Sequence, residues 1–242
     1  MNLAFFFIAL SLLFFTAASG APVVAETRPS EVAGTSGIPS AEMLLRGGLV
    51  SASGLIYWGG VLLQARRVRK RIGRTPNLKP RGTKERLLWA GWMIVIVGWI
   101  AQPFFIGSES LIAALVHPSA LIGGGALIVL GYLATLWCYA AMGAAWRIGI
   151  DREGSSSLVQ TGPYRRMRHP IYSFQMVMIA GAALLLPTPV SLAILVLHFI
   201  CASIKASDEE AHLIAVFDGE YRDYMTRSGR FFPRLRMRRI QG

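Results

Sequence analysis

Residues 171–204 read IYSFQMVMIAGAALLLPTPVSLAILVLHFICASI, and this stretch decides the fold. It contains no Asp, Glu, Lys or Arg, which is typical of a chain that crosses a membrane. A straight helix cannot continue through Pro187-Thr188-Pro189, because proline removes a backbone donor and restricts the residue before it. Each half is about 16 residues, roughly 24 Å as a helix. The stretch therefore predicts a tight helical hairpin with its turn at one membrane face.

The rest of the chain indicates the same environment. It is 53% hydrophobic and 16% charged, with a mean hydropathy of +0.47. Further apolar runs of membrane-spanning length lie at 43–64, 87–106 and 119–145, and a shorter run lies at 3–18. The shorter run is either a signal peptide or a first transmembrane helix. We predict an all-α, polytopic membrane protein with about five to six transmembrane helices and a C-terminal helical hairpin.

Three regions follow from this pattern. Residues 1–42 hold the first apolar run and a linker rich in Ala, Pro, Gly, Ser and Thr. Residues 43–118 hold N-terminal transmembrane helices. Residues 119–242 form the core, which carries the candidate site and ends in a basic tail.

The charge distribution predicts orientation. The chain has 25 Lys and Arg against 13 Asp and Glu. Basic residues crowd the connections 65–86 and 146–170, whereas 107–118 has no Lys or Arg. By the positive-inside rule, the basic connections face the cytoplasm. We expect a multi-pass protein of the bacterial inner (plasma) membrane, with its active site on the cytoplasmic side.

The same distribution limits the partners. The chain carries no signature of a nucleic-acid-binding module, so nucleic acid is not expected as a partner. The basic tail from Arg227 onward is predicted to dock on anionic lipid headgroups. Cys138 and Cys201 lie inside apolar runs and are predicted to be small buried side chains, neither a disulfide nor a metal pair. We predict no metal site.

A polar segment, LVQTGPYRRMRHPIYS at 158–173, interrupts the apolar runs. Gly162-Pro163 predicts a turn and His169-Pro170 predicts a helix start. Charge at the membrane edge is costly and commonly marks a binding or reactive site. The alternative is that Arg165, Arg166 and Arg168 only anchor the chain to the cytoplasmic face.

A second polar segment begins where the last apolar run ends. Glu209 and Glu210 precede a stripe of apolar residues at helical spacing, so they lie at the edge of an amphipathic helix. Two adjacent carboxylates near an apolar core need a cationic partner. Two structural alternatives are a capping box from Ser207 to Glu210 and an ion pair between Lys205 and Glu209.

Together the two segments resemble a known family. The pattern runs Leu158-Val159-x-x-Gly162-Pro163-Tyr164-x-x-x-Arg168-His169-Pro170-x-Tyr172, then Glu209-Glu210-x-x-Leu213-x-x-x-Phe217-x-x-x-Tyr221-x-x-Tyr224. It resembles the isoprenylcysteine carboxyl methyltransferase family, which is related to the membrane phospholipid N-methyltransferases. The resemblance covers roughly 120–233 in the printed sequence.

The resemblance implies S-adenosylmethionine as the cofactor, bound in a cytosolic pocket, with Glu209 at its polar end. It also implies that Lys205 or Arg168 holds the carboxylate of the methyl acceptor. The family has arginine where this chain has Lys205, and lysine keeps the charge but loses the two-pronged geometry. The residues implied to line the cofactor are Ser156, Ser157, Leu158, Val159, Tyr164, His169, Pro170, Ile171, Tyr172, Glu209 and Glu210.

The acceptor is left open by the residues. A membrane-embedded methyltransferase suits a lipidic or apolar small-molecule acceptor, which we expect to enter between helix 119–145 and the hairpin. A carboxylate acceptor needs a cation and no base, whereas an amine must lose a proton, for which Glu209, Glu210 or His169 are candidates. A membrane reductase using NADPH and a non-enzymatic accessory protein are the alternatives from other classes. The pattern makes no prediction of oligomeric state.

Overall fold

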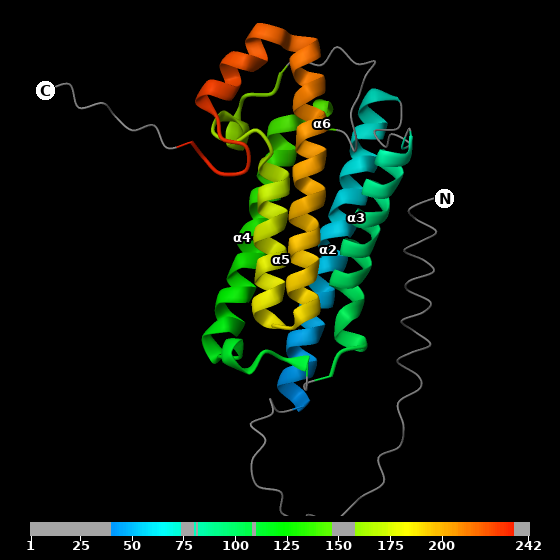
Figure 1. The fold of residues 1–242 in the computed structure, drawn as a ribbon, viewed down its shortest axis with the longest axis vertical. Helices are drawn as coiled ribbons and strands as arrows, with labels where there is room; N and C mark the ends of the chain where they lie inside the picture. The colour runs from blue at the N-terminus through cyan, green and yellow to red at the C-terminus, as the bar shows by residue number, and fades with distance from the viewer. Residues whose placement is uncertain (1–39, 74–79, 81, 108–109, 147–157, 235–242) are drawn as a thin grey trace, which may run out of the picture. The chain divides into compact units, whose positions relative to one another are not determined.

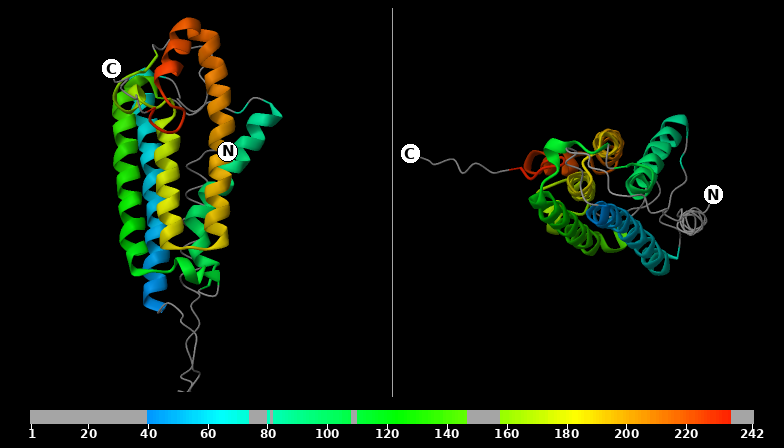
Figure 2. Two further views of the ribbon diagram at one scale, coloured as in Figure 1. Left: turned by 60° about the vertical axis from the view of Figure 1, so that its left-hand side comes forward. Right: turned by 90° about the horizontal axis from the view of Figure 1, so that it is seen from below.

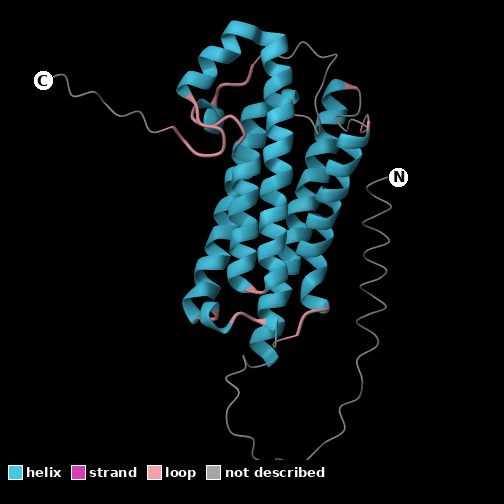
Figure 3. Cartoon of the chain, in the orientation of Figure 1, coloured by secondary structure: helices cyan, strands magenta, loops and turns pink. Residues whose placement is uncertain are grey.

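The computed structural model describes residues 40–73, 80, 82–107, 110–146 and 158–234. In these residues the chain forms helices and short turns but no strand (Figure 3). Among the described residues, four helices are long and apolar enough to cross a membrane and a fifth is shorter, which confirms the predicted all-α, polytopic architecture. The helices are α2 (Ser40–Ile72), α3 (Thr83–Ala101), α4 (Pro118–Met142), α5 (Pro170–Leu185) and α6 (Pro189–Arg227).

Three of these helices begin with a proline. Proline opens α4, α5 and α6 because the first helical position needs no backbone donor. The Thr188 side chain accepts a hydrogen bond from the backbone N–H of Ser191 (3.0 Å), which caps α6. The His117 ring caps α4 in the same way through Ser119 (3.2 Å).

The predicted hairpin is confirmed. α5 ends at Leu185 and α6 begins at Pro189, so the Pro-Thr-Pro sequence forms the turn. The Pro187 carbonyl accepts a hydrogen bond from the N–H of Ile112 (2.8 Å), which ties the turn to the α3–α4 connection. We call this end of the bundle the hairpin end and the opposite end, where α5 begins, the loop end (Figure 1).

α4 packs directly against α5, and the views in Figure 2 show the two helices side by side. A Cβ atom on Gly124 would lie 2.7 Å from the Gly181 carbonyl oxygen, and one on Gly131 would lie 2.8 Å from the Phe174 carbonyl oxygen. Such close backbone approach closes the interface and is typical of small residues in membrane helices. The entry of an acceptor between α4 and the hairpin stays a prediction.

α2 and α3 complete the bundle against α5 and α6. Trp99 and Ile100 of α3 are fully buried, as is Val50 of α2. α3 approaches α6 closely at Gly91, where a Cβ would meet the Cys201 sulfur at 2.7 Å. Both Cys138 and Cys201 are buried free thiols, which confirms the sequence interpretation.

α6 extends far beyond the apolar run that predicts it. The helix continues through Glu209 and Glu210 to Arg227, with one non-helical residue, Asp218 (φ 36°, ψ −109°). After this break the chain turns back across the loop end (Figure 1). Ser207 lies inside the helix and donates to the Ser203 carbonyl (3.0 Å), so the capping box predicted for Ser207 and Glu210 does not form.

Candidate functional site

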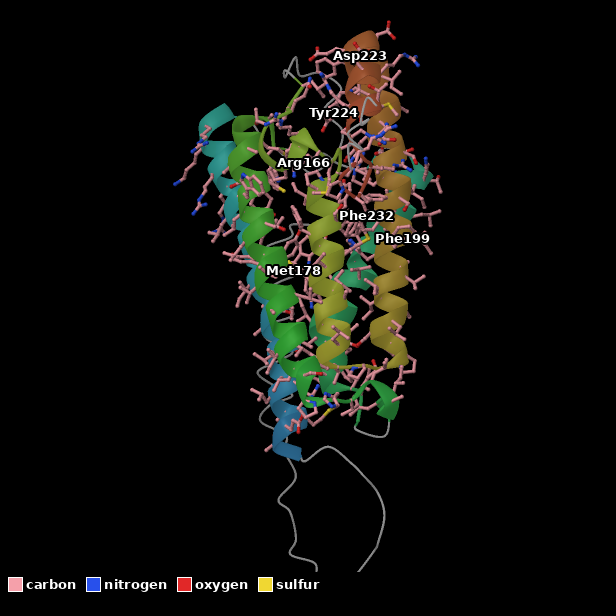
Figure 4. All side chains as sticks on the ribbon, turned by 90° about the vertical axis from the view of Figure 1, so that its left-hand side faces the viewer. Arg166, Met178, Phe199, Asp223, Tyr224 and Phe232 are labelled. Atoms are coloured by element: carbon pink, nitrogen blue, oxygen red, sulfur yellow. The ribbon has the colours of Figure 1, made fainter. Side chains whose placement is uncertain are left out.

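The part of the polar segment that precedes α5, residues 158–169, is called the polar loop. It meets the C-terminal segment 228–231 at the loop end. The N–H of Arg168 donates to the Gly229 carbonyl (2.8 Å), and that of His169 donates to the Arg230 carbonyl (3.0 Å). The Tyr224 hydroxyl donates to the Met167 carbonyl (3.1 Å) from the turned-back part of α6. Figure 4 shows Tyr224 at this end of the molecule, with Met178 farther along α5 toward the hairpin. Segments about sixty positions apart are thereby held together.

Glu210 is the centre of an ion network. Its carboxylate lies 2.8 Å from Nε of Arg168, 3.2 Å from Nε2 of His169 and 3.4 Å from a guanidinium nitrogen of Arg230. The side chains of Arg168 and Glu210 are 10% and 12% exposed, so water screens this pair weakly. Arg168 also donates to the Ser228 carbonyl (2.6 Å). The network joins α6, the polar loop and the C-terminal segment.

Glu209 has a different environment. One oxygen accepts a hydrogen bond from the Tyr172 hydroxyl (2.8 Å), and the other lies 3.4 Å from Nδ1 of His169. Its side chain is 23% exposed, and within the described residues no Arg or Lys pairs with it. A carboxylate oxygen accepts more than one hydrogen bond, so Glu209 retains capacity for a cationic ligand.

His169 lies between the two carboxylates. Burial lowers the pKa of its ring, but the hydrogen bonds and charges of Glu209 and Glu210 outweigh burial and raise the pKa above its usual value. The ring also stacks on Tyr172, with centroids 5.8 Å apart and planes 15° apart. His169, Tyr172 and Glu209 therefore form one contiguous cluster of side chains.

Lys205 lies one helical turn before Glu209 on α6 and is half-buried. The alternative of an ion pair between the two does not form, since Lys205 has no carboxylate partner in the described part of the chain. Residues four apart in a helix share a face, so the ammonium group is on the Glu209 side of α6.

The other residues predicted to line the cofactor differ in their burial and in their contacts. Leu158 and Val159 are half-buried in the polar loop, next to Gln160, whose amide donates to Glu220 (3.0 Å). Tyr164 is buried and its hydroxyl contacts the Met142 sulfur (2.9 Å) on α4. Burial raises the pKa of Tyr164 well above its usual value. Pro170 is buried, Ile171 packs on the apolar core of the bundle, and Ser156 and Ser157 lie outside the described residues.

The sequence interpretation missed two contributors. Phe231 packs with Ala202 and Ala206 of α6 and lies 6.1 Å from the His169 ring, although the tail was expected only to meet lipid. Trp92 of α3 lies 6.0 Å from the Tyr172 ring. Neither residue carried a signal: Phe231 lies in an aperiodic basic segment, and Trp92 lies in a uniformly apolar run.

The fold and this cluster define an integral membrane protein with a charged site at one end of its helical bundle. Comparison with known proteins narrows the class. The family model described as "Phospholipid methyltransferase" matches residues 119–220, which contain α4, α5 and most of α6. Residues 119–220 are therefore similar to that family, which lies within the isoprenylcysteine carboxyl methyltransferase-like group, as the resemblance predicts.

Two curated proteins are similar to the chain. It is 35% identical over 124 residues to the nickel-cobalt-cadmium resistance protein NccN of Alcaligenes xylosoxydans xylosoxydans, covering 51% of this chain and 54% of that protein. It is 27% identical over 148 residues to the cobalt-zinc-cadmium resistance protein CzcN of Cupriavidus metallidurans, covering 61% and 64%. The chain thus spans less than two thirds of either relative's length.

Proposed function

We propose that the protein is a membrane methyltransferase that uses S-adenosylmethionine and methylates a lipidic or apolar acceptor. The family match supports methyl transfer. The observation that carries the proposal is the carboxylate of Glu209, which is held by Tyr172 and His169 yet unpaired with any described Arg or Lys. Its remaining hydrogen-bonding capacity fits an ammonium group.

The residues around Glu209 fit the cofactor's chemistry. S-adenosylmethionine, when bound, supplies a methyl group on a sulfonium, which an acceptor atom attacks. The carboxylate of Glu209 would hold the cofactor's ammonium group. The ring of Tyr172 lies beside Glu209, and the aromatic face of tyrosine attracts cations.

Glu210 and Arg168 serve this site indirectly in the proposal. Each is the other's partner, and Arg168 also binds the Ser228 carbonyl, so both are committed to holding the polar loop against α6. We therefore assign Arg168 to positioning, and Lys205 to the acceptor. An ammonium group without a described partner pairs readily with a carboxylate. A carboxylate acceptor of the isoprenylcysteine type is our first choice, and an amine or phospholipid headgroup is the second.

The proposed orientation follows from charge. The loop end carries the basic residues that end α2, Arg69, Lys70 and Arg71, and the arginines of the polar loop. By the positive-inside rule this end faces the cytoplasm, where the cofactor is made available. We propose that the basic tail from Arg227 onward contacts anionic headgroups.

The names of the two relatives suggest a connection to metal resistance. In the described residues, no three His, Cys, Asp or Glu side chains lie close enough together to hold a metal ion. If the chain contributes to resistance, we infer that it acts through its methylated product. Complementation of a deletion strain grown in cadmium with wild type and with Glu209→Gln tests this, and equal growth with both would contradict it.

The central experiment uses the full chain purified in nanodiscs. S-adenosylhomocysteine and NADPH are titrated separately, and we expect only the former to bind wild type. Glu209→Gln should lose at least tenfold in affinity, as expected for one charge-assisted hydrogen bond of about 1.5–3 kcal/mol. The matched control is Asp208→Asn, next to Glu209 on α6 but paired with Lys84 on the surface (2.5 Å). Binding of NADPH alone would refute the proposal.

A second readout distinguishes the acceptors. Membrane lipid extract is incubated with enzyme and methyl-labelled cofactor, and the product is then treated with base. A methyl ester releases labelled methanol, whereas an N-methyl product retains its label. Release of methanol would support a carboxylate acceptor, and retention would replace it with the amine.

A further inference from the structure

A second group of polar side chains lies deeper in the bundle than Glu209. It comprises Trp92 on α3, Tyr172 and Gln175 on α5, and His198 on α6, and we call it the Trp92 cluster. The Trp92 ring meets His198 edge-on at 4.9 Å and lies 6.0 Å from Tyr172. Nε2 of His198 lies 3.3 Å from the Tyr172 carbonyl. Gln175 is three residues after Tyr172, and therefore on the same side of α5.

His198 has a buried hydrogen-bond acceptor without a described partner. A carbonyl oxygen can only accept, so Nε2 carries the proton that is donated to Tyr172. A charged ring is costly inside a membrane, so Nδ1 carries a lone pair. The residue is 0% exposed, and Nδ1 has no partner among the residues that the structure describes. A buried polar atom without a partner is costly and rare in native proteins.

Gln175 has a buried hydrogen-bond donor where His198 has a buried acceptor. The side chain is 2% exposed, and its amide nitrogen, a donor, also has no partner in the described part of the chain. The bundle thus holds a buried acceptor on α6 and a buried donor on α5, neither with a partner among the described residues. A hydroxyl can donate to the His198 lone pair or accept from the Gln175 amide, whereas a carboxylate would meet the lone pair of His198 unfavourably.

The position of the cluster matches a membrane ligand. His198 lies eleven positions before Glu209 on α6, about 16 Å along the helix toward the hairpin end. Tyr172 connects the two levels, since its hydroxyl binds Glu209 and its carbonyl binds His198. Next to the cluster on α6, Phe199 is 47% exposed on the bundle surface (labelled in Figure 4).

We propose that the Trp92 cluster is a recognition subsite for a hydroxyl or similar hydrogen-bond donor on an otherwise apolar acceptor, away from the atom that is methylated. The assignment of this ligand as the acceptor rests on the proposed methyl transfer. Trp92 lies outside the family-matched residues 119–220, so α3 contributes to the choice of acceptor.

The test compares two probes, tetradecanol and tetradecyl methyl ether, which share a chain and differ in the O–H donor. Their binding to the full chain in nanodiscs is measured by thermal shift for wild type, His198→Asn and His198→Gln. Asparagine places a polar oxygen near the position of Nδ1. Glutamine reaches the position of Nε2, keeps the bond to Tyr172 and removes the acceptor. Ratios between variants cancel the partitioning of each probe into lipid.

We expect wild type and His198→Asn to prefer the alcohol, and His198→Gln to lose roughly tenfold of that preference, the effect of one buried hydrogen bond. The control Phe199→Leu should behave as wild type. Equal alcohol preference in wild type and His198→Gln would overturn the subsite, because a buried water or simple packing gives that result. Binding of S-adenosylhomocysteine to the same samples reports separately on the proposed methyl transfer.

Discussion

Replacing each of the two adjacent glutamates with glutamine should have different consequences. Glu210 faces Arg168, His169 and Arg230 and connects three segments of the chain. Glu209 faces one tyrosine hydroxyl and one ring nitrogen and is more exposed. We predict that Glu210→Gln costs mainly stability, whereas Glu209→Gln costs mainly cofactor binding.

The magnitude follows from the contacts. Removing one partner of a buried ion pair costs about 3–5 kcal/mol, since the other charge is left uncompensated. The side chains of Arg168 and Glu210 keep 10% and 12% exposure, and Arg168 keeps the Ser228 carbonyl, so we expect about 2–3 kcal/mol. For Glu209→Gln the tyrosine hydroxyl still has an oxygen to bind, so the expected loss is under about 1 kcal/mol.

The assay is thermal unfolding of both variants in the same detergent, with S-adenosylhomocysteine titrated in parallel. At about 2–4 °C per kcal/mol for a chain of this size, Glu210→Gln should unfold roughly 5–10 °C below wild type. A double-mutant cycle with Arg168→Met should recover about 1–2 kcal/mol as coupling energy. Equal destabilisation by the two glutamine variants, or no coupling in the cycle, would refute this division of roles.

Three further predictions address other parts of the structure. The pKa of His169 is raised in the folded protein, so the stability that the His169 side chain contributes is complete below its unfolded pKa of about 6.5 and is lost as pH rises through its folded pKa. Chemical unfolding at pH 6 and pH 9 should show this loss of stability in wild type and not in His169→Gln. Gly124→Ala should destabilise the protein by about 1–3 kcal/mol in thermal unfolding, because its Cβ would meet the Gly181 carbonyl oxygen, whereas Gly125→Ala, with open space around it, should not. Lys205→Gln should bind S-adenosylhomocysteine as wild type does but lose turnover in the labelled-methyl assay, and unchanged turnover would remove Lys205 from the acceptor side.

The hairpin was predictable because its signals are local. Pro187 and Pro189 cannot lie within a straight helix, and Thr188 is a good cap between them, so a few neighbouring residues determine the turn. The same holds for the helix start at Pro170. The amphipathic helix beyond Lys205 was also predictable from its apolar spacing, but its continuity with the membrane span was not, since the buried alanines Ala202 and Ala206 at the junction carry little signal.

The division of labour at the site depends on spatial relations that the sequence does not encode locally. Successive helical residues differ by about 100° in direction, so adjacent glutamates necessarily face different surroundings. Which one meets Arg168 depends on where the turned-back end of α6 places Ser228 and Arg230. That placement depends on the break at Asp218, a conformation that local pattern gives no reason to expect outside glycine.

The structure also suggests how one family core accommodates different acceptors. The glutamates, His169 and Tyr172 all lie within residues 119–220, the part matched by the family model. The deeper Trp92 cluster takes a ring from α3, outside that part of the chain. In the proposed function, one set of helices holds the cofactor and another completes the acceptor side, so the two sides can change separately as long as Tyr172, whose ring lies beside Trp92, keeps its hydroxyl bond to Glu209. Exchanging α3 between this chain and a relative should therefore alter which acceptor is used while leaving S-adenosylhomocysteine affinity unchanged. Loss of both together would mean that α3 supports the whole site and does not select its substrate.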